Sequence, residues 1–235
     1  MRILLGCFMS IVMAACASEP APPSTPPGSA TAVAPASDSA RPNSGELRRD
    51  RLPRIVFLGD SLTAGLGLSS DKSFPSLIGR KLKDKGLDYE IINAGVSGDT
   101  SAGGLRRLDW SFEGDVRVLI LALGANDGLR GLPVDDLEKN LTAVLDRAKA
   151  GRIPVILAGM EAPPNNGIDY TTAFRKVYRD LATRYQVRFI PFLLQGVAGD
   201  ASLNQADGIH PNVRGAEIVA DLVWAELEPV IGRPN

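Results

Sequence analysis

The sequence has very few of the side chains that carry thiol, imidazole or transition-metal chemistry. Of its 235 residues only Cys7 and Cys16 are cysteines, and His210 is the only histidine. Because both cysteines lie within the first 16 residues, the rest of the chain cannot form a disulfide scaffold, a thiolate nucleophile or a cysteine zinc site. Metal motifs with two histidines are excluded as well, so any imidazole-dependent chemistry must use His210.

The chain also lacks an excess of charge of either sign. Its 26 basic and 27 acidic residues give a formal net charge of −1 at pH 7. A protein with this balance has no global field that would concentrate nucleic acid or draw the domain to an anionic membrane. We therefore expect no nucleic-acid partner.

Larger aliphatic side chains are scarce in one proline-rich segment. Residues 16–53 contain 8 of the 17 prolines, and their only larger aliphatics are Val33, Leu47 and Leu52. Such a segment cannot bury enough apolar surface to offset the entropy cost of ordering it, so we predict a disordered Pro/Ala/Ser-rich tether. Residues 54–235 are left for a single folded domain, which is long enough to bury roughly two-thirds of its unfolded surface.

The first 15 residues have the pattern of a signal peptide. Arg2 precedes an apolar run over residues 3–15, which is shorter than the roughly 20 residues of a membrane-spanning helix. Met13-Ala14-Ala15-Cys16 resembles a bacterial lipobox, in which small residues precede a cysteine that is lipidated and becomes the mature N-terminus. The alternative is an ordinary cleaved signal with an incidental Cys16. Cys7 also follows lipobox-like residues, but almost no apolar segment precedes it.

These N-terminal features predict a location in the bacterial cell envelope. If Cys16 is lipidated, the membrane is a partner through the lipid anchor. Ala17 is not the aspartate linked with inner-membrane retention, so we expect the outer membrane, with the domain facing the periplasm. Without lipidation, we expect a periplasmic or secreted protein.

Short apolar runs alternate with amphipathic stretches along residues 54–235. The runs lack regular polar alternation, as do strands covered on both faces, and they span residues 55–59, 89–94, 116–124, 155–159 and 187–194. The amphipathic stretches predict helices at residues 74–85, 101–110, 133–150, 170–185 and 212–227. This order predicts an α/β fold, a three-layer sandwich around a five-stranded, mostly parallel sheet.

Ligands of such sheets bind beyond the carboxyl ends of the strands, where the strand order reverses. Four polar loops containing glycine are expected at this edge, at residues 59–62, 95–99, 124–127 and 207–210. We therefore expect the functional residues of the domain to lie in these loops.

The last of these loops contains the lone histidine. A base that accepts a serine proton needs one free imidazole nitrogen, with the other nitrogen held by a carboxylate. Asp207 lies three residues before His210, a spacing that can fold the carboxylate back toward the ring on a turn. A structural alternative is a helix-start cluster, since an acidic residue, a histidine and Pro211 all suit a first helical turn.

A candidate nucleophile follows the first predicted strand. Ser61 lies in a turn that begins with Gly59, where a hydroxyl would be presented at the top of the sheet. The Gly-x-Ser-x-Gly elbow of α/β-hydrolases is absent from the chain. Ser61 could also cap the next helix, and the local sequence does not decide between the two roles.

Acyl transfer also needs donors aimed at the developing oxyanion. Gly98 can offer a backbone N–H, and Asn126, just past the most hydrophobic strand, can offer its side-chain amide. Each has a structural alternative, because Gly98 could simply provide positive φ and Asn126 could form a local Asx turn.

In their order along the chain, these features resemble the four sequence blocks of the SGNH, or GDSL, hydrolase family. The blocks are GDSLTAG at residues 59–65, NAGVSGDT at 93–100, LGANDGLRG at 123–131 and DGIHPN at 207–212. They are most similar to the bacterial multifunctional thioesterase, lysophospholipase and arylesterase group. The resemblance implies a flavodoxin-like SGNH hydrolase fold for residues 54–235, and activity without a cofactor or metal.

The resemblance also implies roles for individual residues. Ser61 is the implied nucleophile, His210 the general base and acid, and Asp207 its orienting partner. The implied oxyanion hole consists of the Ser61 N–H, the Gly98 N–H and the Asn126 side chain. Gly95 has the same chemistry as Gly98, but the Ser-Gly-Asp-Thr alignment favours Gly98.

Asp60 and Asp127 belong to the same motifs, and we interpret them as carboxylates that order their loops. The expected function is a serine esterase that forms an acyl-enzyme with aryl, short-to-medium acyl or lysophospholipid esters, and with acyl thioesters. Its expected partner is therefore a small-molecule ester or thioester.

The sequence leaves four other functions to consider. Gly65-Leu66-Gly67 could indicate nucleotide binding, but no complete phosphate-binding glycine motif follows a strand. Asp60 and Asp127 could hold Mg²⁺ for phosphoryl transfer, although that leaves His210 and Asn126 without a role. A carbohydrate O-acetylesterase would use the same catalytic residues, and a non-catalytic tethered binding module would keep only the pocket.

Overall fold

The computed structural model describes residues 52–232. The predicted signal peptide, the lipidation site at Cys16 and all but the last two residues of the predicted tether lie outside this part of the chain. Within residues 52–232, no helix is both long and apolar enough to cross a membrane.

Five parallel strands form a single sheet in the order β2-β1-β3-β4-β5. The strands are β1 (Arg54–Gly59), β2 (Glu90–Gly95), β3 (Val116–Ala122), β4 (Val155–Ala158) and β5 (Arg188–Ile190). The chain moves from β1 to β2 on one side and returns to β3 on the other, so the strand order reverses at β1. This sheet confirms the predicted α/β fold and its flavodoxin-like strand order.

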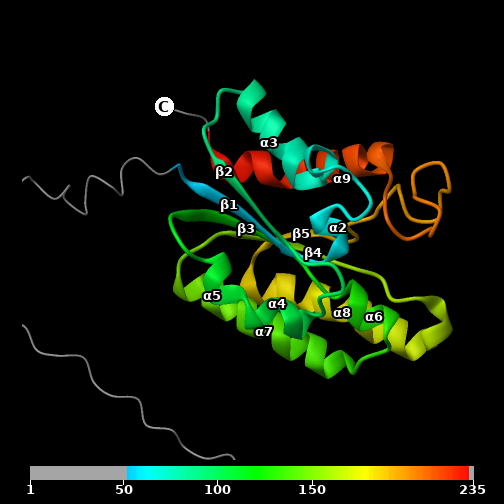
Figure 1. Ribbon diagram of the computed structural model, residues 1–235. Helices are drawn as coiled ribbons and strands as arrows, with labels where there is room; N and C mark the ends of the chain where they lie inside the picture. Colours follow the sequence, from blue (N-terminus) through cyan, green and yellow to red (C-terminus); the bar gives the residue numbers. More distant parts are fainter. Residues whose placement is uncertain (1–51, 233–235) are drawn as a thin grey trace, which may run out of the picture. The chain divides into compact units, whose positions relative to one another are not determined.

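Helices cover both faces of the sheet (Figure 1). One face carries α3 (Phe74–Asp84) and α9 (Val213–Ile231), which pack against each other. The other face carries α4 (Ser101–Arg106), α5 (Leu108–Ser111), α7 (Val134–Ala150) and α8 (Ile168–Tyr185). The remaining helices are α2 (Ser61–Ala64), α6 (Ala125–Leu129) and the 3₁₀ turns η1 (Ser70–Lys72) and η2 (Pro164–Asn166).

Burial on both faces explains the unbroken apolar sequence of the central strand. In β1, the four consecutive side chains Ile55, Val56, Phe57 and Leu58 are all fully buried. A polar side chain at any of these positions would lose its hydration on either face of the sheet, because helices cover both. The hydrophobic run is therefore the sequence signature of a central parallel strand.

The central strands end level with one another. Gly59, the last residue of β1, is paired in register with Gly95 of β2 and with Ala122 at the end of β3. The loops that follow these three strands therefore leave the sheet at a common edge. This register is what brings three of the four predicted site loops together.

Several predicted boundaries are wrong. The last strand ends at Ile190 rather than residue 194, because Pro191 has no N–H to continue the ladder. The stretch 101–110 forms two short helices, α4 and α5, that are separated at Arg107. The last helix continues past residue 227 to Ile231, with Pro229 inside it. The helices α2 and α6 are too short to produce a periodic sequence pattern.

Candidate active site

Ser61 is the first residue of α2, directly beyond the carboxyl end of β1. Asp60, not Ser61, is the N-cap of this helix, because its Oδ1 accepts a hydrogen bond from the Leu62 N–H at 3.0 Å. The structure therefore does not use the Ser61 hydroxyl as the cap. As a first-turn residue, Ser61 also has a backbone N–H that has no acceptor within its own helix.

The Ser61 hydroxyl instead lies against the only imidazole of the chain. Its Oγ is 2.9 Å from His210 Nε2, and His210 Nδ1 is 2.7 Å from Asp207 Oδ2. The two interactions form a continuous line from carboxylate to imidazole to hydroxyl. The line joins residues 149 positions apart in sequence, and it has the arrangement that a general base needs in order to accept a serine proton.

The Asp207–His210 segment is a loop, not the first turn of a helix. Asp207 Oδ1 accepts hydrogen bonds from the N–H groups of Ile209 at 2.9 Å and His210 at 3.0 Å. The next helix, α9, begins at Val213 with Asn212 as its N-cap. One carboxylate oxygen thus folds the loop, and the other is left to hold the imidazole.

These contacts lower the pKa of Asp207 to about 2. The backbone N–H groups of His210 and Ile209 contribute most, and the His210 side chain adds to the effect, because all three stabilise the ionised carboxylate. Asp207 therefore stays negatively charged at every pH at which an esterase would operate, and it can stabilise a protonated imidazole.

Asp60 is in the opposite electrostatic situation. Its side chain is fully buried, and burial raises its pKa from 3.8 to about 6. The Leu62 N–H, and the charge of His210 when the imidazole is protonated, oppose this rise in pKa, but they do not cancel it. Within the described residues, its Oδ2 atom has no hydrogen-bond partner. Its position at the helix cap agrees with the predicted loop-ordering role.

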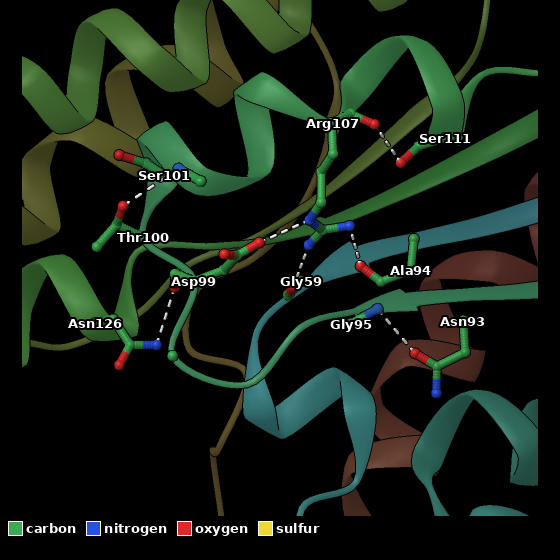
Figure 2. Close-up of polar contacts among 12 residues, drawn as sticks. Gly59, Asn93, Ala94, Gly95, Asp99, Thr100, Ser101, Arg107, Ser111 and Asn126 are labelled. Atoms are coloured by element: carbon green, nitrogen blue, oxygen red, sulfur yellow. Dashed lines mark hydrogen bonds and ion pairs between the residues drawn. The ribbon is translucent and has the colours of Figure 1, made fainter. Parts of the chain in front are cut away.

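Gly98 and Gly95 were both candidates for the backbone donor, and their hydrogen bonds distinguish them. The Gly95 N–H donates to Asn93 Oδ1 at 3.0 Å (Figure 2). No residue between 52 and 232 accepts a hydrogen bond from the N–H of Gly98, which lies in an exposed turn with φ +84°. Only Gly98 therefore offers a free N–H. A Cβ on Gly95 would lie 2.2 Å from the Ala64 nitrogen, so Gly95 allows α2 to pack closely.

Asn126 lies in the first turn of α6, after β3. Its Nδ2 donates to the backbone carbonyl of Asp99 at 2.9 Å, as Figure 2 shows. An Asx turn would instead use the Gly128 N–H, but that group donates to Gly124 O at 3.0 Å. The Asn126 amide is therefore oriented across the site toward the Gly98 loop, and its second amide hydrogen remains for a ligand.

Asp127 connects the segment of Asn126 to the segment that follows Gly98. Its buried carboxylate accepts hydrogen bonds from the Ser101 N–H at 2.7 Å and from the Ser101 hydroxyl at 2.6 Å. Asn140 on α7 donates to the same hydroxyl oxygen at 2.9 Å. This network agrees with the interpretation of Asp127 as a carboxylate that orders its loop, since it faces the protein interior.

Two contributors to the site gave no signal in the sequence. Gln205 Nε2 donates to Leu66 O at 2.7 Å and to Pro211 O at 3.0 Å, and so links the loop after α2 to the loop of His210. Arg107 binds the ends of β1 and β2. Glutamine and arginine are common surface residues, so only their contacts reveal these roles.

Apolar side chains surround the Ser61–His210 pair. A small cavity beside it is lined by residues that include Leu66, Leu68 and Leu194. Its volume of about 10 Å³ has room for roughly one water molecule. Among the described residues, no group of three or more His, Cys, Asp or Glu side chains is arranged to hold a metal ion.

Residues 57–218 match the GDSL-like lipase/acylhydrolase family. The esterase TesA of Pseudomonas aeruginosa is 39% identical over 178 residues, which cover 75% of this chain and 89% of TesA. An arylesterase of Vibrio mimicus is 37% identical over 175 residues, covering 74% of this chain and 88% of the relative.

Thioesterase 1/protease 1/lysophospholipase L1 of Escherichia coli is 35% identical over 182 residues, covering 77% of this chain and 86% of the relative. The fold is similar as well. A crystal structure of TesA matches with a TM-score of 0.72, and the match covers 75% of this chain and 99% of that structure.

Proposed function

The chain belongs to the GDSL-like lipase/acylhydrolase family, as its four motifs predicted, and on this premise we propose that it is a serine esterase acting through an acyl-enzyme. Its relatives are carboxylic ester hydrolases. The observation that carries the proposal is the line Asp207–His210–Ser61, with distances of 2.7 Å and 2.9 Å.

In the first half of the proposed reaction, Ser61 Oγ attacks the ester carbonyl carbon and its proton passes to His210 Nε2. Asp207 is hydrogen-bonded to Nδ1 of His210. It therefore keeps the imidazole in the tautomer whose Nε2 is free, and it stabilises the imidazolium that forms. The carbonyl oxygen becomes negatively charged. The N–H groups of Ser61 and Gly98 and the Asn126 amide then donate hydrogen bonds to it. When the tetrahedral intermediate collapses, His210 gives its proton to the departing alcohol or thiol.

In the second half, water replaces the alcohol. His210 Nε2 takes a proton from the water as the resulting hydroxide adds to the acyl carbon, and the same donors stabilise the second oxyanion. The Ser61–acyl bond then breaks, Ser61 Oγ recovers the proton from His210, and the carboxylic acid leaves. Ser61 and His210 return to their starting protonation states.

Apolar side chains in the catalytic loops support an apolar acyl or aryl group as substrate. Four of the large hydrophobic residues that are 44–49% exposed lie within five positions of a candidate catalytic or oxyanion residue. They are Leu66, Val96, Leu129 and Ile209. We propose aryl and short-to-medium acyl esters as the preferred class, with acyl thioesters and lysophospholipids as further substrates, in line with the names of the relatives.

Substrate profiling tests this proposal. p-Nitrophenyl esters from C2 to C16, phenyl acetate, an acyl-CoA, a lysophospholipid and an acetylated sugar are compared by kcat/KM. We expect the aryl and short-to-medium acyl esters to give the highest values. A clear preference for the acetylated sugar would indicate a carbohydrate O-acetylesterase instead, and no turnover of any substrate would indicate a tethered binding module.

We also propose that Cys16 carries the lipid anchor of an envelope protein and that residues 54–235 form the hydrolase domain. The support is the apolar run that ends in Met13-Ala14-Ala15-Cys16 and the proline-rich composition of residues 16–53. The full chain expressed in a Gram-negative host should fractionate with membranes, whereas Cys16→Ser should not. Unchanged membrane association of this variant would contradict lipidation at Cys16.

A further inference from the structure

Arg107 holds three segments of the site together. Its Nε donates to Asp99 Oδ2 at 2.7 Å, its Nη1 to Ala94 O at 2.6 Å and its Nη2 to Gly59 O at 2.7 Å. Figure 2 shows the guanidinium between these three acceptors. The residue lies between α4 and α5, at the point where the helical stretch breaks, and its side chain is 19% exposed.

The three acceptors belong to the segments that present the proposed catalytic groups. Gly59 is the end of β1 and lies two residues before Ser61. Ala94 is the residue before the last of β2, and Asp99 directly follows Gly98. The Arg107 guanidinium therefore connects the segment that carries Ser61 to the segment that carries Gly98.

Asn126 is connected to the same group through Asp99. The carboxylate of Asp99 accepts from Arg107, while its backbone carbonyl accepts from the Asn126 amide at 2.9 Å. A Cβ on Gly103 would lie 2.6 Å from Asp99 Oδ1, so the glycine leaves the space that the carboxylate occupies. The position of Asp99 thus affects both Gly98 and Asn126.

The chemistry of arginine suits this position. The carbonyl groups at the ends of parallel strands need donors once they are shielded from water, and a guanidinium provides several in a fixed plane. A lysine ammonium has the same charge, but it is a point on a flexible stem and does not fix the relative directions of three acceptors. Arg107 therefore balances the charge of Asp99 and also fixes the relative positions of its three acceptors.

We propose that Arg107 is a positioning residue that sets the distance between Ser61 and the oxyanion donors Gly98 and Asn126. The proposal rests on the esterase function proposed above. Oxyanion donors act only when they lie about 2.7–3.1 Å from the developing charge, and a misplacement of about 1 Å can lower the rate by about 10²-fold. Arg107 touches no reacting atom, and its contribution comes through the backbone that it holds.

The chain contains a matched control at the other end of the same strand. Arg54, at the start of β1, donates to Glu90 Oε2 at 2.6 Å and to Glu113 O at 2.8 Å, and its side chain is 20% exposed. Like Arg107, it binds a carboxylate and a backbone carbonyl of segments next to β1. It lies at the amino end of the sheet, away from the catalytic loops.

The experiment compares Arg107→Lys and Arg107→Gln with Arg54→Lys and Arg54→Gln in the full chain. For each variant, kcat and KM for a p-nitrophenyl ester, the melting temperature and the folded fraction by circular dichroism are measured. We expect both Arg107 variants to lose about 10- to 100-fold in kcat per folded molecule, with KM changed less than about threefold. The Arg54 variants should lose comparable stability but keep kcat within about twofold.

A double-mutant cycle identifies the route of the effect. If Arg107 acts through the oxyanion donors, Arg107→Lys should cost less in kcat when Asn126 is already alanine than it costs in the wild type. If the fold loss in kcat of the double variant equalled the product of the two single losses, Arg107 and Asn126 would act independently, which would contradict this route. Equal kcat losses for the Arg107 and Arg54 variants, or unfolding of both Arg107 variants while the Arg54 variants fold, would assign Arg107 a structural role only and overturn the proposal.

The failure of the esterase proposal would look different. In that case the wild-type chain would hydrolyse none of the esters, and a fluorophosphonate probe would not label Ser61. An active, labelled wild type with unaffected Arg107 variants would refute only the positioning role.

Discussion

The two halves of the candidate site are held in different ways. The proton-transfer half rests on one short loop, in which Asp207 bonds the backbone of the residues next to it and then the ring of His210. The oxyanion half is assembled from distant segments, since Asn126 bonds Asp99 from 27 positions away and Arg107 bonds Gly59 from 48 positions away.

The difference also appears in exposure. The Asp207 side chain is 45% exposed, whereas the Asp99 and Arg107 side chains are 18% and 19% exposed. Local hydrogen bonds order Asp207 of the first half without much burial, although the His210 side chain is only 16% exposed. In the second half, both members of the Arg107–Asp99 pair are largely buried. We therefore expect changes in the proton-transfer half to affect chemistry with little loss of stability, and changes in the oxyanion half to affect both.

The largest expected effect comes from the nucleophile that both halves serve. Ser61→Ala should lower kcat for ester hydrolysis by roughly 10⁴- to 10⁶-fold, because no acyl-enzyme can form. The melting temperature should change little, since Asp60 caps the helix. A fluorophosphonate probe should label the wild type at Ser61, and the exposed Ser69→Ala variant should keep full activity. Labelling at another residue would contradict the assignment.

Asp207→Asn breaks the proton-transfer half alone. The asparagine Oδ1 can still accept from the backbone N–H groups of residues 209 and 210, so the loop should remain folded. The neutral amide cannot stabilise the imidazolium, and we expect kcat to fall about 10³- to 10⁴-fold. Kinetics and thermal melting on one preparation check this, and a variant with kcat near that of the wild type would remove Asp207 from the proton-transfer line.

Asn126→Ala breaks the oxyanion half. The loss of one donor aimed at the transition-state oxyanion typically costs about 10²- to 10³-fold in kcat, or about 2.7–4 kcal/mol, with little change in KM. Stability should fall by about 1 kcal/mol, because the bond to Asp99 O is lost as well. If Asn126→Ala were destabilised but had normal kcat per folded molecule, Asn126 would not be an oxyanion donor.

The last comparison concerns stability rather than activity, and it distinguishes the two aspartates by the pH dependence of unfolding. A folded-state pKa near 6 means that folded Asp60 holds its proton more tightly than the unfolded chain does, so its ionisation destabilises the fold as pH rises from about 4 to about 6. The shift corresponds to roughly 3 kcal/mol above that window. Asp60→Asn should therefore gain stability relative to the wild type as pH rises from 4 to 7.

Asp207 should show the opposite sign in a lower window. Its folded pKa of about 2 contributes stability that is present above pH 4 and is lost as pH falls through about 2. Denaturant midpoints measured at pH 2, 4, 5.5 and 7 test both aspartates. A difference between wild type and Asp60→Asn that stays constant with pH would contradict the raised pKa of Asp60.

Much of the fold and the site could be predicted from local sequence. The apolar runs predicted all five strands, because strands buried on both faces must be hydrophobic throughout. The short motifs predicted the candidate residues Ser61, His210 and Asp207. Boundaries were less certain, since the end of β5 depends on Pro191 and the short helices α2 and α6 have no periodic pattern.

The sequence by itself determined the chemical inventory of this protein. It has one imidazole, a serine after the first strand, and an aspartate three residues before the histidine, where local backbone hydrogen bonds can fold the carboxylate onto the ring. These features depend on residue identity and short spacing, which a linear pattern contains. The motif alignment also favoured Gly98 over Gly95, and the structure adds the reason, because the Gly95 N–H already donates to Asn93 Oδ1.

Only the tertiary structure decided how the oxyanion half is held. Arg107 and Gln205 are ordinary polar residues in the sequence, and they gain their roles from acceptors 48 and 139 positions away. Such contacts depend on the level ends of β1, β2 and β3, which the register of the whole sheet fixes. A register is a collective property of paired strands, so no short stretch of sequence specifies which distant carbonyl a side chain will bind.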